Sequence, residues 1–250
     1  MRTRLKRNLK LAKPAPEQTE SAEPADDVDD RIYATLAAAI NQGALKPGAK
    51  ILEDAIAEHF KVSRTVVRGA LGILQRDHLL ERKRNRGTFV AEPTVDEARQ
   101  LFEARRAMEC TILEMVVGRA KPDALNHLAE IAEDEKRIHA GSDEPAKTGL
   151  AGQFHIELAK VSGNGVLTEL LGKVVARLSL VMARFGVDHT DECGAHDHLQ
   201  IVDAIRAGKR DQALQLMTDH LADIERRVRL VEDHGDRNSF ESVLAAFSGQ

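Results

Sequence analysis

Aromatic residues are scarce in this chain, which has no tryptophan, one tyrosine and seven phenylalanines among 250 residues. Proteins that bind RNA or single-stranded DNA stack the bases on aromatic side chains. The shortage therefore argues against single-stranded nucleic acid or RNA as the main partner. No apolar run approaches the ~20 residues that span a bilayer. The basic N-terminus has no apolar segment behind it that would make a secretory signal, so we expect no membrane association.

Cysteine is equally rare, with only Cys110 and Cys193 in the sequence. The two are far apart and do not form a pair with metal-ligand spacing. Disulfides are uncommon in the reducing cytoplasm. We expect two buried free thiols in a cytoplasmic protein.

Charge is unevenly distributed along the chain, although the net charge is only −4. Residues 31–92 carry 11 basic and 6 acidic side chains, a net charge of +5, whereas residues 93–250 have a net charge of −8. A basic module joined to an acidic one is typical of a protein that presents one end to phosphate groups. The boundary between the two modules is expected at Pro93.

Two polar tails flank these modules. Residues 1–29 begin with a basic run and continue with a proline-rich, acidic run that offers almost no apolar periodicity to pack, so we expect a disordered tail. Its basic half either adds non-specific DNA affinity or is a solubilising extension, and both readings remain open. Residues 233–250 are expected to form a second tail.

Residues 30–92 show the pattern of a winged helix-turn-helix. A helix is expected from Asp30 to about Gln42, and a second from Glu53 to Phe60, followed by a turn and by Ser63 as the N-cap of a recognition helix. The buried stripe of that helix has i, i+3, i+4, i+7 spacing and consists of Val67, Ala70, Leu71 and Leu74.

Two arginines fall on the other side of the recognition helix, Arg64 in its first turn and Arg68 one turn later. A cation in the first turn opposes the helix macrodipole, and the two like charges repel each other. A helix tolerates this arrangement readily when a polyanion meets that face, so the pair indicates docking on DNA. The following segment, 79–90, is expected to be a basic hairpin, with Asn85 and Gly87 supplying the positive φ of its turn.

Residues 93–232 contain only helical signals. Six helices are expected, ending near Ala120, Ala140, Ser162, Phe185, Ala207 and Glu232. The predicted fold class is therefore mainly α: an N-terminal winged helix-turn-helix and a C-terminal all-α bundle of six or more helices.

The motif residues resemble a known family. Pro47-Gly48, Leu52-Glu53, Val62-Ser63-Arg64, Val67-Arg68 and Arg86-Gly87 look like the DNA-binding domain of GntR-type bacterial regulators. The C-terminal helices resemble the FCD domain of the FadR branch, through Arg105 and Glu109, Phe154-His155, Gly163-Asn164, His198, Gly208 and His220-Leu221. The resemblance covers about residues 31–231. It departs from the family pattern at Lys61, where glycine is usual, and at Gly69, where glutamate is usual.

The FCD resemblance implies a divalent metal, with Zn²⁺ or Ni²⁺ as the expected ion. Its histidine ligands would be His155, His198 and His220. The aspartate that usually completes the set corresponds to Ala151. The fourth position would then be open to water or an effector carboxylate. A site without metal, whose imidazoles bind an anionic effector directly, remains the alternative.

Two arginines of the bundle are candidates for effector binding. Arg105 matches the family arginine of the first FCD helix, and Arg177 lies in apolar surroundings. The alternative for each is a structural salt bridge, for example with Glu109 or Glu169.

The sequence therefore predicts a DNA-binding transcriptional regulator, most simply a repressor, that is not an enzyme. It would bind a palindromic operator in double-stranded DNA as a homodimer and respond to a small organic acid. The residues expected to contact DNA are Ser63, Arg64, Thr65, Arg68, Arg86 and Gly87. The competing hypothesis is a metal-dependent enzyme that uses the three-histidine site and its open position.

Overall fold

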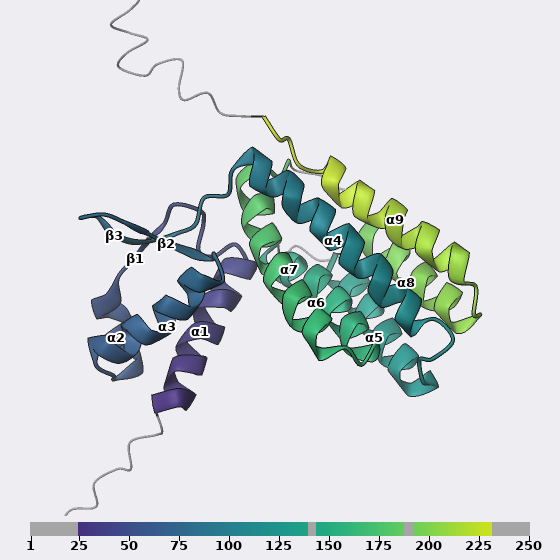
Figure 1. Ribbon diagram of the computed structural model, residues 1–250, viewed down its shortest axis with the longest axis horizontal. Coiled ribbons are helices and arrows are strands. Elements are labelled where there is room, and N and C mark those ends of the chain that lie inside the picture. Colours follow the sequence, from purple (N-terminus) through teal and green to yellow (C-terminus); the bar gives the residue numbers. More distant parts are fainter. Residues whose placement is uncertain (1–24, 140–143, 188–192, 232–250) are drawn as a thin grey trace, which may run out of the picture.

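The computed structural model describes residues 25–139, 144–187 and 193–231. The chain forms a small N-terminal domain with three strands, joined to a larger bundle of helices (Figure 1). This arrangement confirms the predicted fold class. The predicted tails lie outside the described residues, apart from the end of the first one. No helix in the described ranges is long and apolar enough to cross a membrane.

The N-terminal domain packs helix α1 against the helix-turn-helix, with the wing beside it. Its elements are α1 (Ala25–Asn41), β1 (Lys50–Ile51), α2 (Glu53–Phe60), α3 (Arg64–Arg76), β2 (Leu80–Lys83) and β3 (Gly87–Val90).

Helix α1 begins five residues earlier than the helix expected from Asp30. The reason is that the apolar stripe continues backwards by one turn, because Val28 precedes Ile32 by four residues and both are buried. This stripe packs on α3. A Cβ atom at Gly69 would lie 2.8 Å from the Asp29 carboxylate, so the glycine inside α3 gives room to an α1 side chain.

The recognition helix α3 matches the sequence prediction closely. Ser63 precedes it in an extended conformation, and its side chain accepts a hydrogen bond from the Val66 amide. The four residues of the predicted stripe are all buried. Because the buried stripe fixes the rotation of the helix about its axis, Arg64 and Arg68 lie on its exposed side.

The wing is a three-stranded antiparallel sheet in the order β1-β3-β2. Its hairpin pairs Leu80 with Val90 and Lys83 with Gly87. Asn85 and Gly87 have φ angles of 58° and 104°, which confirms the turn expected from the sequence.

The six expected helices of the bundle are present. They are α4 (Val95–Val116), α5 (Pro122–His139), α6 (Glu144–Val161), α7 (Gly165–Phe185), α8 (Cys193–Arg206) and α9 (Arg210–Arg226). Helix α9 ends six residues before the predicted Glu232. The chain there turns back onto the end of α7, where Val228 pairs with Gly186 in an antiparallel bridge.

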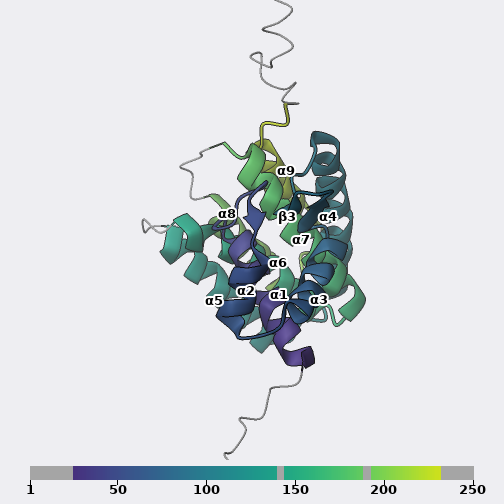
Figure 2. The same ribbon diagram turned by 90° about the vertical axis from the view of Figure 1, so that its left-hand side faces the viewer.

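The two domains meet along α7, which packs on both α4 and α1. Leu180 of α7 is buried in the hydrophobic cluster of the N-terminal domain. Polar contacts flank it: Tyr33 donates a hydrogen bond to Asp77, and Lys173 of α7 pairs with the same carboxylate. Figure 2, turned by 90°, shows α2, α3 and β3 in front of the bundle. A shift of α7 would therefore be felt directly by the N-terminal domain.

Lys61 has a strained backbone conformation, and its cost can be tested by substitution. It ends α2 with φ 55° and ψ 44°, the left-handed conformation in which a Cβ atom is unfavourable. We expect Lys61→Gly to raise the free energy of unfolding by about 1 kcal/mol, because glycine adopts this conformation without strain. Urea denaturation measures the effect. Lys61→Ala removes the same charge but keeps the Cβ atom, so an equal gain in that control would refute the explanation.

Candidate functional site

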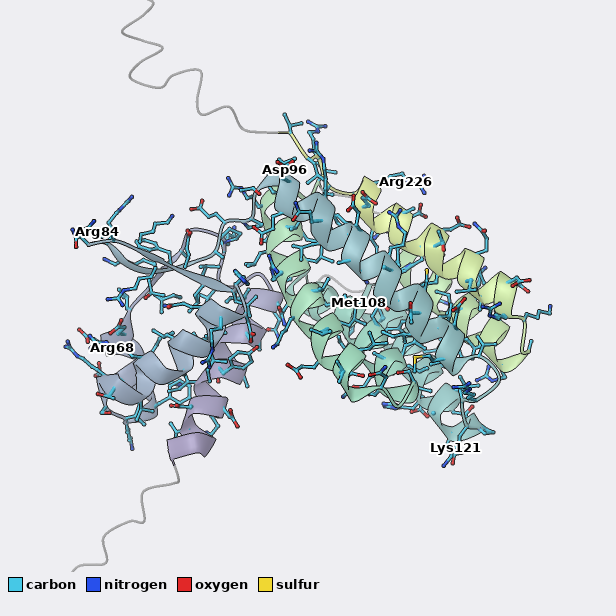
Figure 3. The ribbon with its side chains drawn as sticks, viewed as in Figure 1. Arg68, Arg84, Asp96, Met108, Lys121 and Arg226 are labelled. Atoms are coloured by element: carbon cyan, nitrogen blue, oxygen red, sulfur yellow. The ribbon has the colours of Figure 1, made fainter. Side chains whose placement is uncertain are left out.

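The first candidate site is the end of the N-terminal domain that lies away from the bundle. Arg68 of α3 and Arg84 of the wing tip both project there (Figure 3). The Arg64 and Arg68 side chains are 63% and 65% exposed. Neither arginine is enclosed in the protein, so both can reach an external partner.

Both arginines form ion pairs with acidic residues, and the sequence did not predict these pairs. Asp54 Oδ1 lies 2.7 Å from Arg64 Nε, and Glu53 Oε2 lies 2.8 Å from Arg68 Nε. Both carboxylates come from the first turn of α2. The two acidic residues open the helix that directly precedes the arginine-bearing recognition helix. This position in the sequence could have indicated them as partners of the arginines.

The other predicted DNA contacts are also at the surface. Thr65, Arg86 and Gly87 are exposed, and the Arg86 guanidinium lies over the Phe89 ring at 6.0 Å. Lys83 belongs to the basic hairpin together with Arg82, Arg84 and Arg86, and its ammonium group pairs with Glu92 and Glu81. These hydrogen bonds raise the pKa of Lys83. Its role in the structure is to hold the base of the wing.

A groove separates the recognition helix from the wing. It is lined by Glu53, Arg68, Leu71, Gln75, Arg82 and Thr88. Thr88 and Arg82 are directly paired across the wing strands. The groove is continuous with the exposed arginine face of α3, so a bound polyanion would meet Arg68 and Arg82 together.

The second candidate site is a buried cluster of three histidines, called here the histidine cluster. His155 of α6, His198 of α8 and His220 of α9 are at most 2% exposed. Their Nε2 atoms face one another: His198 lies 3.0 Å from His220, and His155 lies 3.3 Å from each of them. These ligand atoms are close enough to share one metal ion. The Phe154 ring stacks on His198 at 4.0 Å.

A carboxylate stands behind each imidazole. Glu109 lies 2.5 Å from Nδ1 of His155, Glu135 lies 2.6 Å from Nδ1 of His198, and Asp197 lies 3.2 Å from Nδ1 of His220. A carboxylate accepts a hydrogen bond, so each neutral ring donates from Nδ1 and keeps its Nε2 lone pair. Three lone pairs then point into one space.

Burial keeps the imidazoles of His155 and His198 neutral. It lowers the pKa of His155 to about 3, against the attraction of Glu109, and lowers the pKa of His198 well below its usual value. Burial also disfavours the Glu109 carboxylate, but the attraction of His155 and Arg105 outweighs it and lowers the pKa of Glu109 to about 2. Two neutral imidazoles therefore lie beside the ionised Glu109 carboxylate, a combination that suits metal binding.

The two arginines predicted to bind an effector occupy different places. Arg105 is buried beside the histidine cluster, where its Nε donates to Glu109 Oε1 at 2.6 Å. Arg177 pairs with Glu97 at 2.5 Å and lines a cleft at the domain junction together with His78 and Pro93. The structure brings Arg105 to the histidines and places Arg177 near the domain boundary.

The predictions for Ala151 and for the two cysteines can be compared with the structure only in part. The side chains of Ala151 and Cys193 lie outside the described residues, and Cys110 is a free, partly buried thiol. Glu135 and Asp197 were missed as partners of the histidines. The sequence could have indicated that Glu135 is buried, because Glu135 lies one helical turn after Ala132 on the same face as Leu128. A buried glutamate needs a polar partner. No such pattern indicated Asp197, apart from its neighbour His198.

Comparison with known families agrees with both domains. Residues 29–90 match the family of bacterial regulatory proteins called gntR, and residues 100–223 match the FCD domain. The chain belongs to the GntR family of bacterial regulators and carries a C-terminal FCD domain. FCD domains commonly bind a metal, and the histidine cluster could hold one.

Individual relatives are similar over most of their length. The chain is 28% identical to the HTH-type transcriptional regulator LutR of Bacillus subtilis, over 74% of this chain and 94% of that protein. It is 27% identical to the regulator YdhC of the same organism, over 83% and 94%. A putative GntR regulator from Rhodococcus superposes with a TM-score of 0.70 at 27% identity, covering 81% of this chain and all of the other.

The McbR/YncC structure of Escherichia coli shares the fold, with a TM-score of 0.71 at 18% identity over 80% of this chain and 97% of that one. Together these findings identify the chain as a transcriptional regulator of the GntR family, with a DNA-binding domain and an effector-binding domain. The family and the relatives named here are described as regulators.

Proposed function

We propose that this protein is a repressor that binds a palindromic operator as a homodimer and is controlled by a small carboxylate bound beside a metal ion. The observation that supports the DNA-binding part most strongly is the exposed arginine pair on the outer side of α3. Relatives named as repressors include RspR of Escherichia coli, at 23% identity, and a probable D-xylose utilization operon repressor of Paenarthrobacter nicotinovorans, at 28%.

The recognition helix would enter the major groove. Arg64 and Arg68 would contact base edges or nearby phosphates, with Ser63 and Thr65 at the helix N-terminus. Arg86 and Gly87 at the wing tip would reach the minor groove or its phosphates. In a dimer, two such helices would lie ~34 Å apart on successive major grooves.

The histidine cluster fits a divalent metal in two respects. Zinc bound at ~2.0–2.1 Å in a tetrahedral site separates its ligand atoms by about 3.3 Å, close to the observed Nε2 separations of 3.0 and 3.3 Å. In their ionised forms, the three carboxylates behind the rings and the Arg105 guanidinium carry a net charge of −2, which one divalent cation would balance. Zn²⁺ or Ni²⁺ suits an all-imidazole site.

A small carboxylate is the effector class that this site suits. His155, His198 and His220 would supply three ligands, and Ala151 stands where the usual aspartate would supply the fourth. Bound metal would attract an effector carboxylate as a Lewis acid, and Arg105, buried beside the histidine cluster, stays a predicted effector contact. Arg177 at the domain junction stays a predicted effector contact.

The packing of α6 and α7 offers a route from this site to the DNA-binding domain. His155 lies on α6, where a Cβ atom at Gly152 would approach Val175 of α7 to 3.0 Å. Helix α7 in turn buries Leu180 in the N-terminal domain. An effector that prefers one position of α6 would therefore bias the placement of the DNA-binding domain, with Pro93 as the joint.

Arg68→Ala tests the DNA-binding part. We expect operator binding to weaken by about 1–3 kcal/mol, because a bidentate contact to guanine is lost. Fluorescence anisotropy on the DNA upstream of the coding region measures this, and wild-type affinity should fall steeply with salt as counterions are released. Arg76→Ala, at the far end of α3, removes the same charge and serves as the control. Equal losses in both variants would remove Arg68 from the interface.

His198→Ala tests the metal. We expect elemental analysis after loading with Zn²⁺ or Ni²⁺ to find about one ion per chain in the wild type and almost none in the variant. His196→Ala is the matched control, because His196 lies on the same helix but is exposed, and its ring contacts the Gln200 side chain. A wild-type protein that carries no more metal than His198→Ala would refute the site.

The effector class is tested by thermal denaturation of the metal-loaded protein with a panel of small mono- and dicarboxylic acids. A ligand at 100 times its Kd adds about 2.7 kcal/mol to the stability, which corresponds to a rise in Tm of roughly 5–10 °C for a domain of this size. The rise should vanish in His198→Ala and persist in His196→Ala. A rise that is the same with and without metal would favour direct binding by the imidazoles.

A further inference from the structure

The first turn of α2 holds the two arginines of α3 from behind. Glu53 Oε2 accepts a hydrogen bond from Arg68 Nε at 2.8 Å, and Asp54 Oδ1 lies 2.7 Å from Arg64 Nε. Two successive residues of one helix thus meet two residues of another that are one turn apart. Each arginine of the exposed face of α3 therefore has its own carboxylate partner on α2.

The identity of the paired nitrogen is informative. A guanidinium is planar and has five N–H donors, of which one is on Nε and two are on each terminal nitrogen. A carboxylate bound at Nε leaves the edge formed by the two terminal nitrogens directed away from it. That edge is the one that reads O6 and N7 of guanine as a bidentate pair. The carboxylates therefore hold the arginines without occupying their base-reading edge.

These ion pairs contribute little to stability. The Arg68 and Glu53 side chains are 65% and 30% exposed, and those of Arg64 and Asp54 are 63% and 69% exposed. Exposed pairs are screened by water and salt. These ion pairs therefore affect DNA binding by the arginines more than the stability of the fold.

The same carboxylates oppose indiscriminate binding to DNA. Two negative charges beside Arg64 and Arg68 repel phosphates and cancel part of the arginine charge that would otherwise release counterions. Both lie in the first turn of α2, where the helix dipole favours negative charge. Glu53 also lines the groove between α3 and the wing, together with Gln75 and Arg82.

We propose that Glu53 and Asp54 are specificity-determining residues of the DNA-binding domain: Glu53 positions Arg68, and Asp54 positions Arg64, for base reading, while both weaken sequence-independent binding. This inference rests on the proposed binding of duplex DNA through α3. It makes the carboxylates positioning residues, because they act through the arginines. Discrimination between sequences, and not affinity alone, is the property that they control.

The test uses the full chain and two duplexes of equal length and composition. One is selected by the wild-type protein from a random duplex library, and the other is its shuffled sequence. The dissociation constants of both are measured by fluorescence anisotropy at several salt concentrations, and their ratio is the specificity. Glu53→Gln is the variant, and Glu58→Gln, which removes one negative charge from an exposed position of the same helix, is the control.

Loss of a complete bidentate contact would lower the specificity about 5- to 150-fold, so we expect Glu53→Gln to lower it about tenfold. The shuffled duplex should bind more tightly to this variant, because one repulsive charge is gone. Glu58→Gln should keep the wild-type specificity. A new selection with Glu53→Gln should show a relaxed guanine preference at one position of each half-site, which a merely structural role of Glu53 would not produce.

Arg68→Lys provides the second arm, because it keeps the charge and loses the planar fork. Adding Glu53→Gln to Arg68→Lys should leave the specificity unchanged if Glu53 acts through Arg68. A specificity within twofold of wild type for Glu53→Gln, an equal fall in Glu58→Gln, or a further fall in the Arg68→Lys background would each overturn the inference. If the wild type selects no duplex, the proposed function fails as well; if it does, only this inference is at stake.

Discussion

At both candidate sites of this protein, a carboxylate forms a hydrogen bond with a nitrogen of an arginine or histidine side chain, on the side away from the expected ligand. In the bundle, Glu109 and Glu135 accept hydrogen bonds from Nδ1 of two buried imidazoles and leave their Nε2 lone pairs facing inward. In the DNA-binding domain, Glu53 accepts from Nε of Arg68 and leaves the terminal nitrogens facing outward. A hydrogen bond at one atom thus sets the direction in which the opposite edge can bind.

The carboxylate hydrogen bonds have different consequences at the two sites, because one site is buried and the other is exposed. Around His155 and His198 there is almost no water, so an unbalanced charge would be costly and a cation is favoured where lone pairs converge. Around Arg64 and Arg68 the pairs are solvated, so they are weak and can adapt to a polyanion. Burial therefore suits the histidine cluster to hold an ion firmly, and exposure suits the arginine face to a reversible partner.

Helix α7 is the physical link between these sites. It contacts α6 at Gly152, about one turn from His155, and its residue Leu180 is part of the core of the N-terminal domain. Lys173 and Ser179 add polar contacts to Asp77 and Asn41 on either side. A close-packed interface of this kind transmits displacement because it cannot deform continuously.

The sequence by itself determined the recognition helix, the wing turn and the six helices of the bundle, because periodicity, caps and positive-φ residues are local properties. It also marked His155, His198 and His220 through family resemblance, and Arg68 through helical geometry. Only the tertiary structure decided which carboxylate meets which nitrogen, since Glu109 and His155 are 46 residues apart and Glu135 and His198 are 63 apart. Such pairings depend on how whole helices pack, and no local pattern encodes them.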